Sequence, residues 1–390
     1  MEQLQKCRVN SRVGIGKSDM MKDVEGFLTP LNVSVALITA TIVCMFGITR
    51  PYHNWDMIGY VASAYQKDGY RGNDLLEQTY RDVRADVSDT MFKELISAGY
   101  RETVYNDPKA LEQQIPFYSI RVAYLEMIRQ LSHLGLTYSR STYIVSSIFA
   151  ALSVCMLAIL IVNANVSIVT LPLVVLPTGI LDLARLSTPD AIACFWGLLC
   201  IVTLLANSRW SLLLAAILPI VRTDFVLLSF LVGIYEFSRG RKLQSVIALV
   251  TSFLICVAIN KSSSNYGWLT LFNFTFMGLT PYPADLVPSV NISDYLRPYF
   301  TVATHIISHS HFPIYLVASY ALVTSSRRLI DLHETIVLVV LPMMFVLFHL
   351  ALYPAYFPRF FVFSAAVVFV WLLSQFRLPY STGARGQNQL

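Results

Sequence analysis

The hydrophobic positions of this chain are gathered into long, nearly uninterrupted runs. The first run covers residues 30–48, and the others cover about 142–162, 166–181, 189–206, 211–237, 243–260, 301–323, 334–352 and 360–376. A helix needs roughly 20 mostly apolar residues to cross a bilayer. The pattern therefore predicts an all-α polytopic membrane protein.

The run at 211–237 differs from the others because Arg222 and Asp224 lie at its middle. A charged side chain at the centre of a bilayer costs at least about 2.5–3.5 kcal/mol. Two short helices, 211–220 and 225–237, would bring both charges to a helix junction instead. With this break the sequence predicts about ten transmembrane helices, two of them short.

Residues 50–140 hold no spanning run, but they are periodic. Apolar residues at steps of three and four predict an amphipathic helix that carries Leu76, Tyr80, Val83, Val87, Met91 and Leu95. A second helix is expected to open at Pro116 and to carry Ile120, Tyr124, Ile128 and Leu131. Residues 100–114 between them are expected to form a polar loop. We expect both helices to lie along the membrane surface or to cap the helices below.

Composition and charge agree with this picture. Charged residues make up 14% of the chain, whereas a soluble domain carries about 25%. The net charge of +5 calls for no nucleic-acid partner, so the basic residues are interpreted as topology signals. The positive-inside rule then gives a cytosolic tail at 1–27, a transmembrane domain at 28–376 with an outer loop at 50–140, and a cytosolic tail at 377–390.

Asp56 is the first candidate for chemistry. It follows the first apolar run and is flanked by Trp55 and Tyr60, which favour the membrane interface. A carboxylate at that depth is partly desolvated yet reaches an aqueous substrate, which suits a general base. His53 is close enough to tune or shield it. The competing interpretation is an aromatic anchor beside a solvated Asp.

In the predicted topology, further ionisable residues converge on the same outer face: Arg185, Asp190, Arg222, Asp224 and Arg359. Such residues at membrane depth are functional candidates, although snorkelling or a structural ion pair explains any one of them. Three arginines beside several acids predict a cleft for an anionic ligand that also contains a base.

His305 and His309 are one helical turn apart, a spacing that can bind a metal. No Glu lies between them as in the known zinc motif, and histidines at an interface are common. We therefore predict no metal cofactor, with a divalent ion left open, and keep His305 as a substrate-binding candidate.

Together these features resemble the membrane-embedded glycosyltransferases of the GT-C superfamily. Asp56 and Tyr60 match the acid and the aromatic of that family's first-loop motif, and Met57 stands where some members have Glu. Arg359 and Phe360 loosely echo a late Arg-Tyr-x-x-Pro motif. The resemblance implies transfer of a sugar from a polyprenyl-phosphate donor at the outer leaflet to a glycan or lipid-linked acceptor, often without a metal.

Roles follow from the resemblance and from the chemistry of such a transfer. A base must take the acceptor proton, and cations must stabilise the departing phosphate. Asp56 is the expected base, and Arg359, Arg222 and Arg185 are the candidates for the phosphate. The expected substrate-binding residues are Tyr60, His53, Asp190, Asp224 and His305.

Two other functions remain open. A broken helix with charges at its junction also marks transporters, so a lipid or polysaccharide flippase is an alternative. A polysaccharide polymerase, whose sites are Arg-rich outer loops, is another. The position of Arg222 and Asp224 separates an enzyme from a carrier, because an enzyme needs them beside Asp56. Compact tails without a retention signal lead us to expect a bacterial plasma membrane, with membrane lipids as partners.

Overall fold

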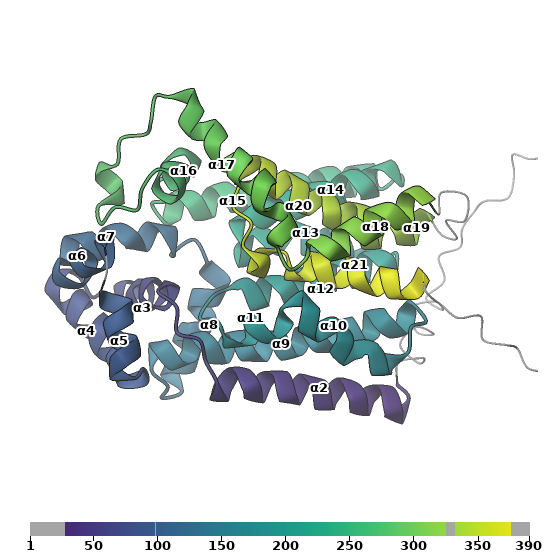
Figure 1. Cartoon of the computed structure of the whole chain (residues 1–390), viewed down its shortest axis with the longest axis horizontal. Helices are drawn as coiled ribbons and strands as arrows, with labels where there is room; N and C mark the ends of the chain where they lie inside the picture. The colour runs from purple at the N-terminus through teal and green to yellow at the C-terminus, as the bar shows by residue number, and fades with distance from the viewer. Residues whose placement is uncertain (1–27, 98, 325–331, 376–390) are drawn as a thin grey trace, which may run out of the picture.

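The computed structural model describes residues 28–97, 99–324 and 332–375. Within these ranges every regular element is helical, and the single pairing of extended backbone is an isolated bridge between Tyr52 and Leu186. The long helices run side by side along one axis, and a group of shorter helices covers one end of the bundle (Figure 1). The all-helical prediction is confirmed for this part of the chain.

Four of the described helices are long and apolar enough to cross a membrane. They are α2 (Pro30–Thr49), α9 (Tyr138–Asn163), α15 (Lys242–Ser262) and the helix over Leu332–Leu352 that ends in α20 (Leu341–Leu352). A fifth span is present if α17 (Ile292–His305) and α18 (Phe312–Thr324) count as one, although they are bent by 84°. The uninterrupted helix expected at 301–323 is therefore wrong, and the total of about ten spans stays a prediction.

Shorter apolar helices complete the bundle. They are α10 (Leu171–Thr178), α11 (Ile180–Arg185), α12 (Asp190–Leu205), α13 (Trp210–Val221), α14 (Val226–Ser238) and α21 (Val362–Gln375). The break predicted within 211–237 is present, because the turn η3 (Thr223–Phe225) separates α13 from α14. A helix of 12 residues rises only about 18 Å. The η3 turn therefore lies recessed within the bundle.

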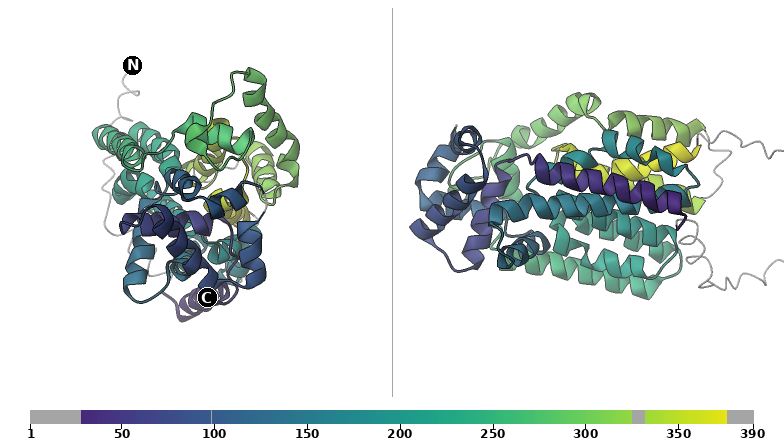
Figure 2. Two further views of the ribbon diagram at one scale, coloured as in Figure 1. Left: turned by 90° about the vertical axis from the view of Figure 1, so that its left-hand side faces the viewer. Right: turned by 90° about the horizontal axis from the view of Figure 1, so that it is seen from below.

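The helices that cover the end of the bundle, here called the cap, come from the long polar segment. They are α3 (Asp56–Lys67), α4 (Gly72–Asp86), α5 (Asp89–Ile96), α6 (Tyr100–Asn106), α7 (Pro108–Gln114) and α8 (Val122–His133). Figure 2 shows α3 to α7 gathered beyond the ends of the long helices. The predicted surface helices thus become a compact cap on the bundle.

Three expectations for the cap were wrong. The first amphipathic stretch is two helices, because Ser88 Oγ accepts a hydrogen bond from Met91 N at 3.3 Å and starts α5 as an N-cap. Residues 100–114 are helical, because the Asp107 side chain caps α7 by accepting from Lys109 N at 2.9 Å. The last helix begins at Val122, since Pro116 lies in the turn η1 (Ile115–Phe117).

The cap is fixed to the bundle near Asp56. Within the cap, Gly59 of α3 allows the segment before α8 to approach closely, because a Cβ there would lie 2.5 Å from the ring of Tyr118. The strand-like segment before α3 is fastened as well, since Tyr52 N donates to Arg185 O at 2.9 Å. The first residues of α3 are therefore held at the junction of cap and bundle. The predicted tails at 1–27 and 377–390 and the cytosolic loop at 325–328 lie outside the described residues.

Candidate functional site

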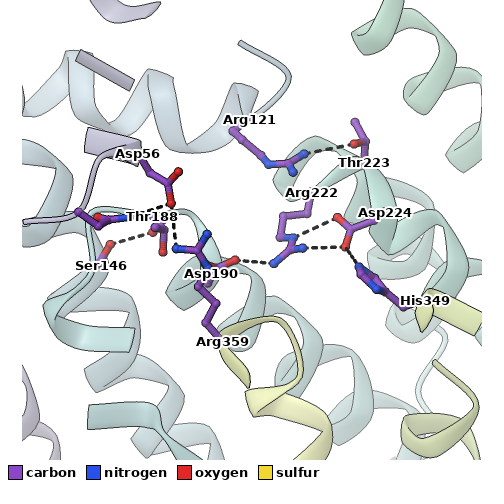
Figure 3. A network of polar contacts seen from close by, with 11 residues as sticks. Asp56, Arg121, Ser146, Thr188, Asp190, Arg222, Thr223, Asp224, His349 and Arg359 are labelled. Carbon is purple, nitrogen blue, oxygen red and sulfur yellow. Dashed lines mark hydrogen bonds and ion pairs between the residues drawn. The ribbon is translucent and has the colours of Figure 1, made fainter. Parts of the chain in front are cut away.

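A chain of alternating charges crosses the junction of cap and bundle (Figure 3). Arg359 Nη1 lies 2.8 Å from Asp56 Oδ2, and Arg359 Nε lies 3.4 Å from Asp190 Oδ2. Arg222 contacts the other oxygen of Asp190 and also Asp224. We call the set the polar network; it consists of Asp56, Arg359, Asp190, Arg222, Asp224 and His349.

Local structure explains why the acids are stable where they are. Asp56 is the first residue of α3, and Asp190 is the first residue of α12. A carboxylate at a helix N-terminus is favoured by the helix dipole. Arg222 leaves α13 with extended backbone, at φ −149° and ψ 126°, and so turns out of the helix toward Asp190.

All three side-chain nitrogens of Arg222 donate to carboxylates. Its Nε and Nη2 donate to the two oxygens of Asp224 at 3.0 and 2.8 Å, and its Nη1 donates to Asp190. The residue is only 2% exposed. Two parallel hydrogen bonds fix the plane of a guanidinium, so Arg222 holds both acids in one geometry.

Asp56 and Arg359 are more accessible than the centre of the network. Their side chains are 25% and 27% exposed. Burial opposes the charge of Arg359, but the carboxylates of Asp56 and Asp190 outweigh it and raise its pKa. Asp56 also accepts from Asn54 Nδ2 at 2.7 Å and from the Tyr118 hydroxyl at 3.3 Å. The carboxylate is thus oriented by three donors while one side remains open.

Arg121 is a site residue that sequence reasoning missed. It is the N-cap residue of α8, and its Nη1 donates to Thr223 Oγ1 at 3.2 Å beside Arg222 (Figure 3). Among the described residues no carboxylate lies within ion-pair distance of Arg121, whereas Arg222 and Arg359 each contact two. In the sequence, Arg121 only makes the predicted helix after Pro116 too polar to cross a membrane.

His349 is the second missed residue. It lies on α20, and its Nε2 is 3.3 Å from Asp224 Oδ2. The signal was a single His within an apolar run, a pattern that more often reflects a buried histidine with satisfied hydrogen bonds. Its position at the end of the polar network became visible only in three dimensions.

Four predicted site residues do not join the polar network, and two of them, Arg185 and His305, have their contacts elsewhere. Arg185 Nε donates to the backbone oxygen of Arg50 at 2.7 Å, and its guanidinium lies 5.3 Å from the ring centre of Phe46. His305 is exposed, and its Nδ1 lies 2.8 Å from Thr301 O of its own helix. Arg185 therefore fastens α11 to the end of α2, and His305 faces away from the site.

Tyr60 and His53 flank the network without contacting it through a hydrogen bond in the described structure. Tyr60 is buried edge-on against Tyr118 and Tyr124, with ring centres 5.1 and 4.9 Å apart. His53 packs edge-on against Tyr143 at 5.7 Å. Tyr60 thus forms part of the aromatic wall behind Asp56.

Across the described ranges, no three His, Cys, Asp or Glu side chains are grouped to hold a metal ion. The arrangement does bring one accessible carboxylate together with two accessible guanidinium groups. Comparison with known proteins gave no matching family model, no matching curated protein and no matching solved structure. The function is therefore inferred from the chemistry of the polar network.

Proposed function

We propose that this chain is a membrane glycosyltransferase. It moves a sugar from a polyprenyl-phosphate or related lipid-phosphate donor to a hydroxyl of a glycan or lipid-linked acceptor at the outer face. The observation that carries the proposal is the contact of Asp56 with Arg359, which shares Asp190 with Arg222. A transfer from a phosphate to a hydroxyl needs a base and cations in one place.

The reaction assigns one task to each accessible group. The acceptor oxygen forms a bond to the anomeric carbon, and its proton passes to the carboxylate of Asp56. The bond between the anomeric carbon and the phosphate oxygen breaks, and the phosphate leaves with the electron pair. Arg359 and Arg121 stabilise the charge that develops on that oxygen.

The contacts of the three arginines divide their roles. Arg222 is buried and saturated by Asp190 and Asp224, so it positions these acids and does not bind the donor. Arg359 is partly exposed and uses a single nitrogen on Asp56. Arg121 has no carboxylate partner among the described residues. Arg359 and Arg121 therefore contact the phosphate, and Arg121 takes the role that was predicted for Arg185.

The pairing of Arg359 with Asp56 also orders the steps. A carboxylate that is bound to a guanidinium is a weaker proton acceptor than a free one. A donor phosphate offers Arg359 a further anion beside Asp190 and draws it away from Asp56. Donor binding thus releases the base at the moment when the acceptor needs it.

The test uses the full-length protein in detergent or proteoliposomes with synthetic polyprenyl-phosphoryl hexoses. Asp56→Asn keeps the shape of the side chain but cannot take the proton, so transfer should fall about 10²–10⁴-fold while donor binding persists. Asp74→Asn, at an exposed acid of the cap, is the matched control. Near wild-type turnover of well-folded Asp56→Asn would end the proposal.

A flippase is the second candidate, and broken helices favour it. Besides η3, the chain bends by 84° between α17 and α18, and Gly179 separates α10 from α11 with φ +84°. Such breaks accompany transporter sites. Movement of a fluorescent lipid-linked sugar across the proteoliposome bilayer without any transfer product would favour this function, and long glycan products would favour a polymerase.

A further inference from the structure

Three consecutive residues before Asp56 carry buried polar atoms without partners. His53 Nδ1, Asn54 Oδ1 and Trp55 Nε1 are sealed from solvent, and no described residue makes a hydrogen bond with them. Trp55 as a whole is 7% exposed. Each unmade hydrogen bond of this kind costs about 1–3 kcal/mol. The described residues contain fifteen such atoms, and these three stand out because they lie on consecutive residues directly before Asp56. Buried polar atoms normally have partners, so this cluster favours a partner that binds there.

A fourth unpaired atom lies on the neighbouring segment. Thr188 is 2% exposed, and its Oγ1 has no hydrogen-bond partner within the described ranges. Tyr52 and Leu186 form a parallel bridge, so residues 53–56 and 187–190 continue from it in the same direction. The two segments end at Asp56 and Asp190, which Arg359 contacts together. The unpaired atoms therefore belong to residues that lie within three positions of Asp56 or Asp190 in the chain.

Neighbouring contacts fix the orientation of these atoms. Asn54 uses its Nδ2 on Asp56 Oδ2 at 2.7 Å, so its Oδ1 remains as an acceptor. The Trp55 ring is wedged between Tyr100 and Tyr118, with ring centres at 5.3 and 6.1 Å. Its N–H can only donate. The site thus presents a rigid acceptor, a rigid donor and, at Thr188, a hydroxyl that can do either.

We propose that His53, Asn54, Trp55 and Thr188 form a hydroxyl-binding subsite that holds a sugar ring beside Asp56. The inference rests on the proposed glycosyltransferase function and names the residues that recognise its sugar. Sugar hydroxyls both donate and accept, and they satisfy this mixed set of atoms. A phosphate would face the acceptor of Asn54, and an acyl chain would leave all four atoms unpaired.

Trp55→Phe tests the subsite separately from the stability of the fold. It keeps an aromatic ring in place and removes the N–H that has no protein partner, together with two ring carbons. Loss of one hydrogen bond should weaken binding of a sugar-bearing probe about tenfold. The melting temperature of the ligand-free protein should fall through the packing lost with those carbons. The affinity for the probe is therefore the deciding measurement.

Trp268→Phe is the matched control. The Trp268 Nε1 donates to Leu352 O at 2.7 Å, so its N–H is already used by the protein. This variant should lower the melting temperature and leave every probe affinity unchanged. The pair of variants thus separates a ligand contact from an internal one.

Three probes identify the source of the sugar: polyprenyl phosphate alone, polyprenyl-phosphoryl hexose, and the methyl glycosides of glucose, mannose and galactose. Trp55→Phe should not change binding of the bare lipid phosphate. Weaker binding of the lipid-linked hexose alone places the donor sugar in the subsite, and weaker binding of a methyl glycoside alone places the acceptor there.

The outcomes also keep the two proposals apart. If the wild type transfers sugar and Trp55→Phe binds all probes equally well, the atoms hold ordered water only and the inference is overturned. If the wild type transfers no sugar but Trp55→Phe still weakens a glycoside probe, the subsite stands and the glycosyltransferase proposal fails.

Discussion

Two groups of buried charges lie at opposite ends of α14, and they are built in different ways. Asp224 precedes the helix and belongs to the polar network, and Glu236 lies in its last turn, about 18 Å away. Glu236 is fully buried, with Arg241 Nη1 2.8 Å from its Oε2 and Arg239 Nη1 3.8 Å from its Oε1. These contacts are ion pairs with poor hydrogen-bond alignment, because both Glu236 oxygens lack a hydrogen-bond partner in the described structure.

The Glu236 group is local and closed. Its arginines follow within five residues, and Arg241 Nη2 donates to Asn207 O at 2.6 Å, which ties the end of α14 to the loop before α13. The polar network instead draws residues from α3, α12, η3, α20 and the loop before α21. It joins segments far apart in the chain, and its Asp56 and Arg359 come from the cap and from the segment before α21. The comparison separates charges that are paired within one stretch of chain from charges that join distant segments of the cap and the bundle.

Arg359→Ala tests the polar network and should have the largest effect of the proposed variants. It removes a cation that stabilises the leaving phosphate and leaves Asp56 without its partner, so transfer should fall about 10³-fold. Donor KM should rise as well, because the contact exists before the reaction. Arg359→Lys should restore only part of the rate, since an ammonium lacks the guanidinium fork. Full activity of the Ala variant would make the network structural, like the Glu236 group.

Glu236→Gln tests the Glu236 group at the other end of α14. It leaves Arg241 without its carboxylate, and breaking a buried pair costs about 3 kcal/mol of unfolding free energy. Thermal or denaturant unfolding in detergent should show the loss, while kcat and KM of the surviving folded protein stay unchanged. A selective loss of kcat in stable protein would show that the two ends of α14 are coupled.

Arg121→Gln sharpens the comparison within the cap. Because Arg121 pairs with no carboxylate in the described structure, its loss should cost little stability but raise the donor KM roughly 10–100-fold. Arg129→Gln on the same helix is the control, since Arg129 pairs with Asp68 at 2.9 Å and Glu126 at 3.0 Å. That variant should reduce stability slightly and leave the donor KM alone. Equal KM values for both variants would remove Arg121 from the phosphate site.

These examples show what the sequence could reveal about the site. The junction at Arg222 was predictable, because charges inside an apolar run carry a large cost wherever the chain folds. Whether Arg185 or Arg121 lies beside the polar network was not predictable. Both residues begin or end short helices, and only tertiary packing decides which carboxylates they meet. Arg185 donates a hydrogen bond to Arg50 O, whereas Arg121 lies in the cap and donates to Thr223.

The fold shows the same division. Long apolar helices follow from hydropathy, and the caps at Ser88 and Asp107 are local signals that the sequence contains but that periodicity alone overlooked. The 84° bend after α17 has a local signal in Pro313, the second residue of α18, but no local signal sets its angle. It depends on contacts such as His311 Nε2 with Thr178 O at 3.0 Å, which join segments far apart in the chain.

Tyr118→Phe gives the smallest expected effect and tests how finely the base is held. Burial, and then the charge of Asp56, raise the pKa of Tyr118 well above its usual value, so its hydroxyl stays protonated and donates to Asp56 Oδ1. Removing one such hydrogen bond should lower kcat about 3–10-fold with little change in donor KM. Because the phenol keeps its proton below its raised pKa, the factor should be equal at about pH 6 and about pH 9. A factor that shrinks toward high pH would mean that the wild-type phenol ionises there and that Tyr118 is less buried than its contacts indicate. An unchanged kcat would mean that Asn54 and Arg359 alone orient Asp56, and the aromatic wall of the cap would then serve packing only.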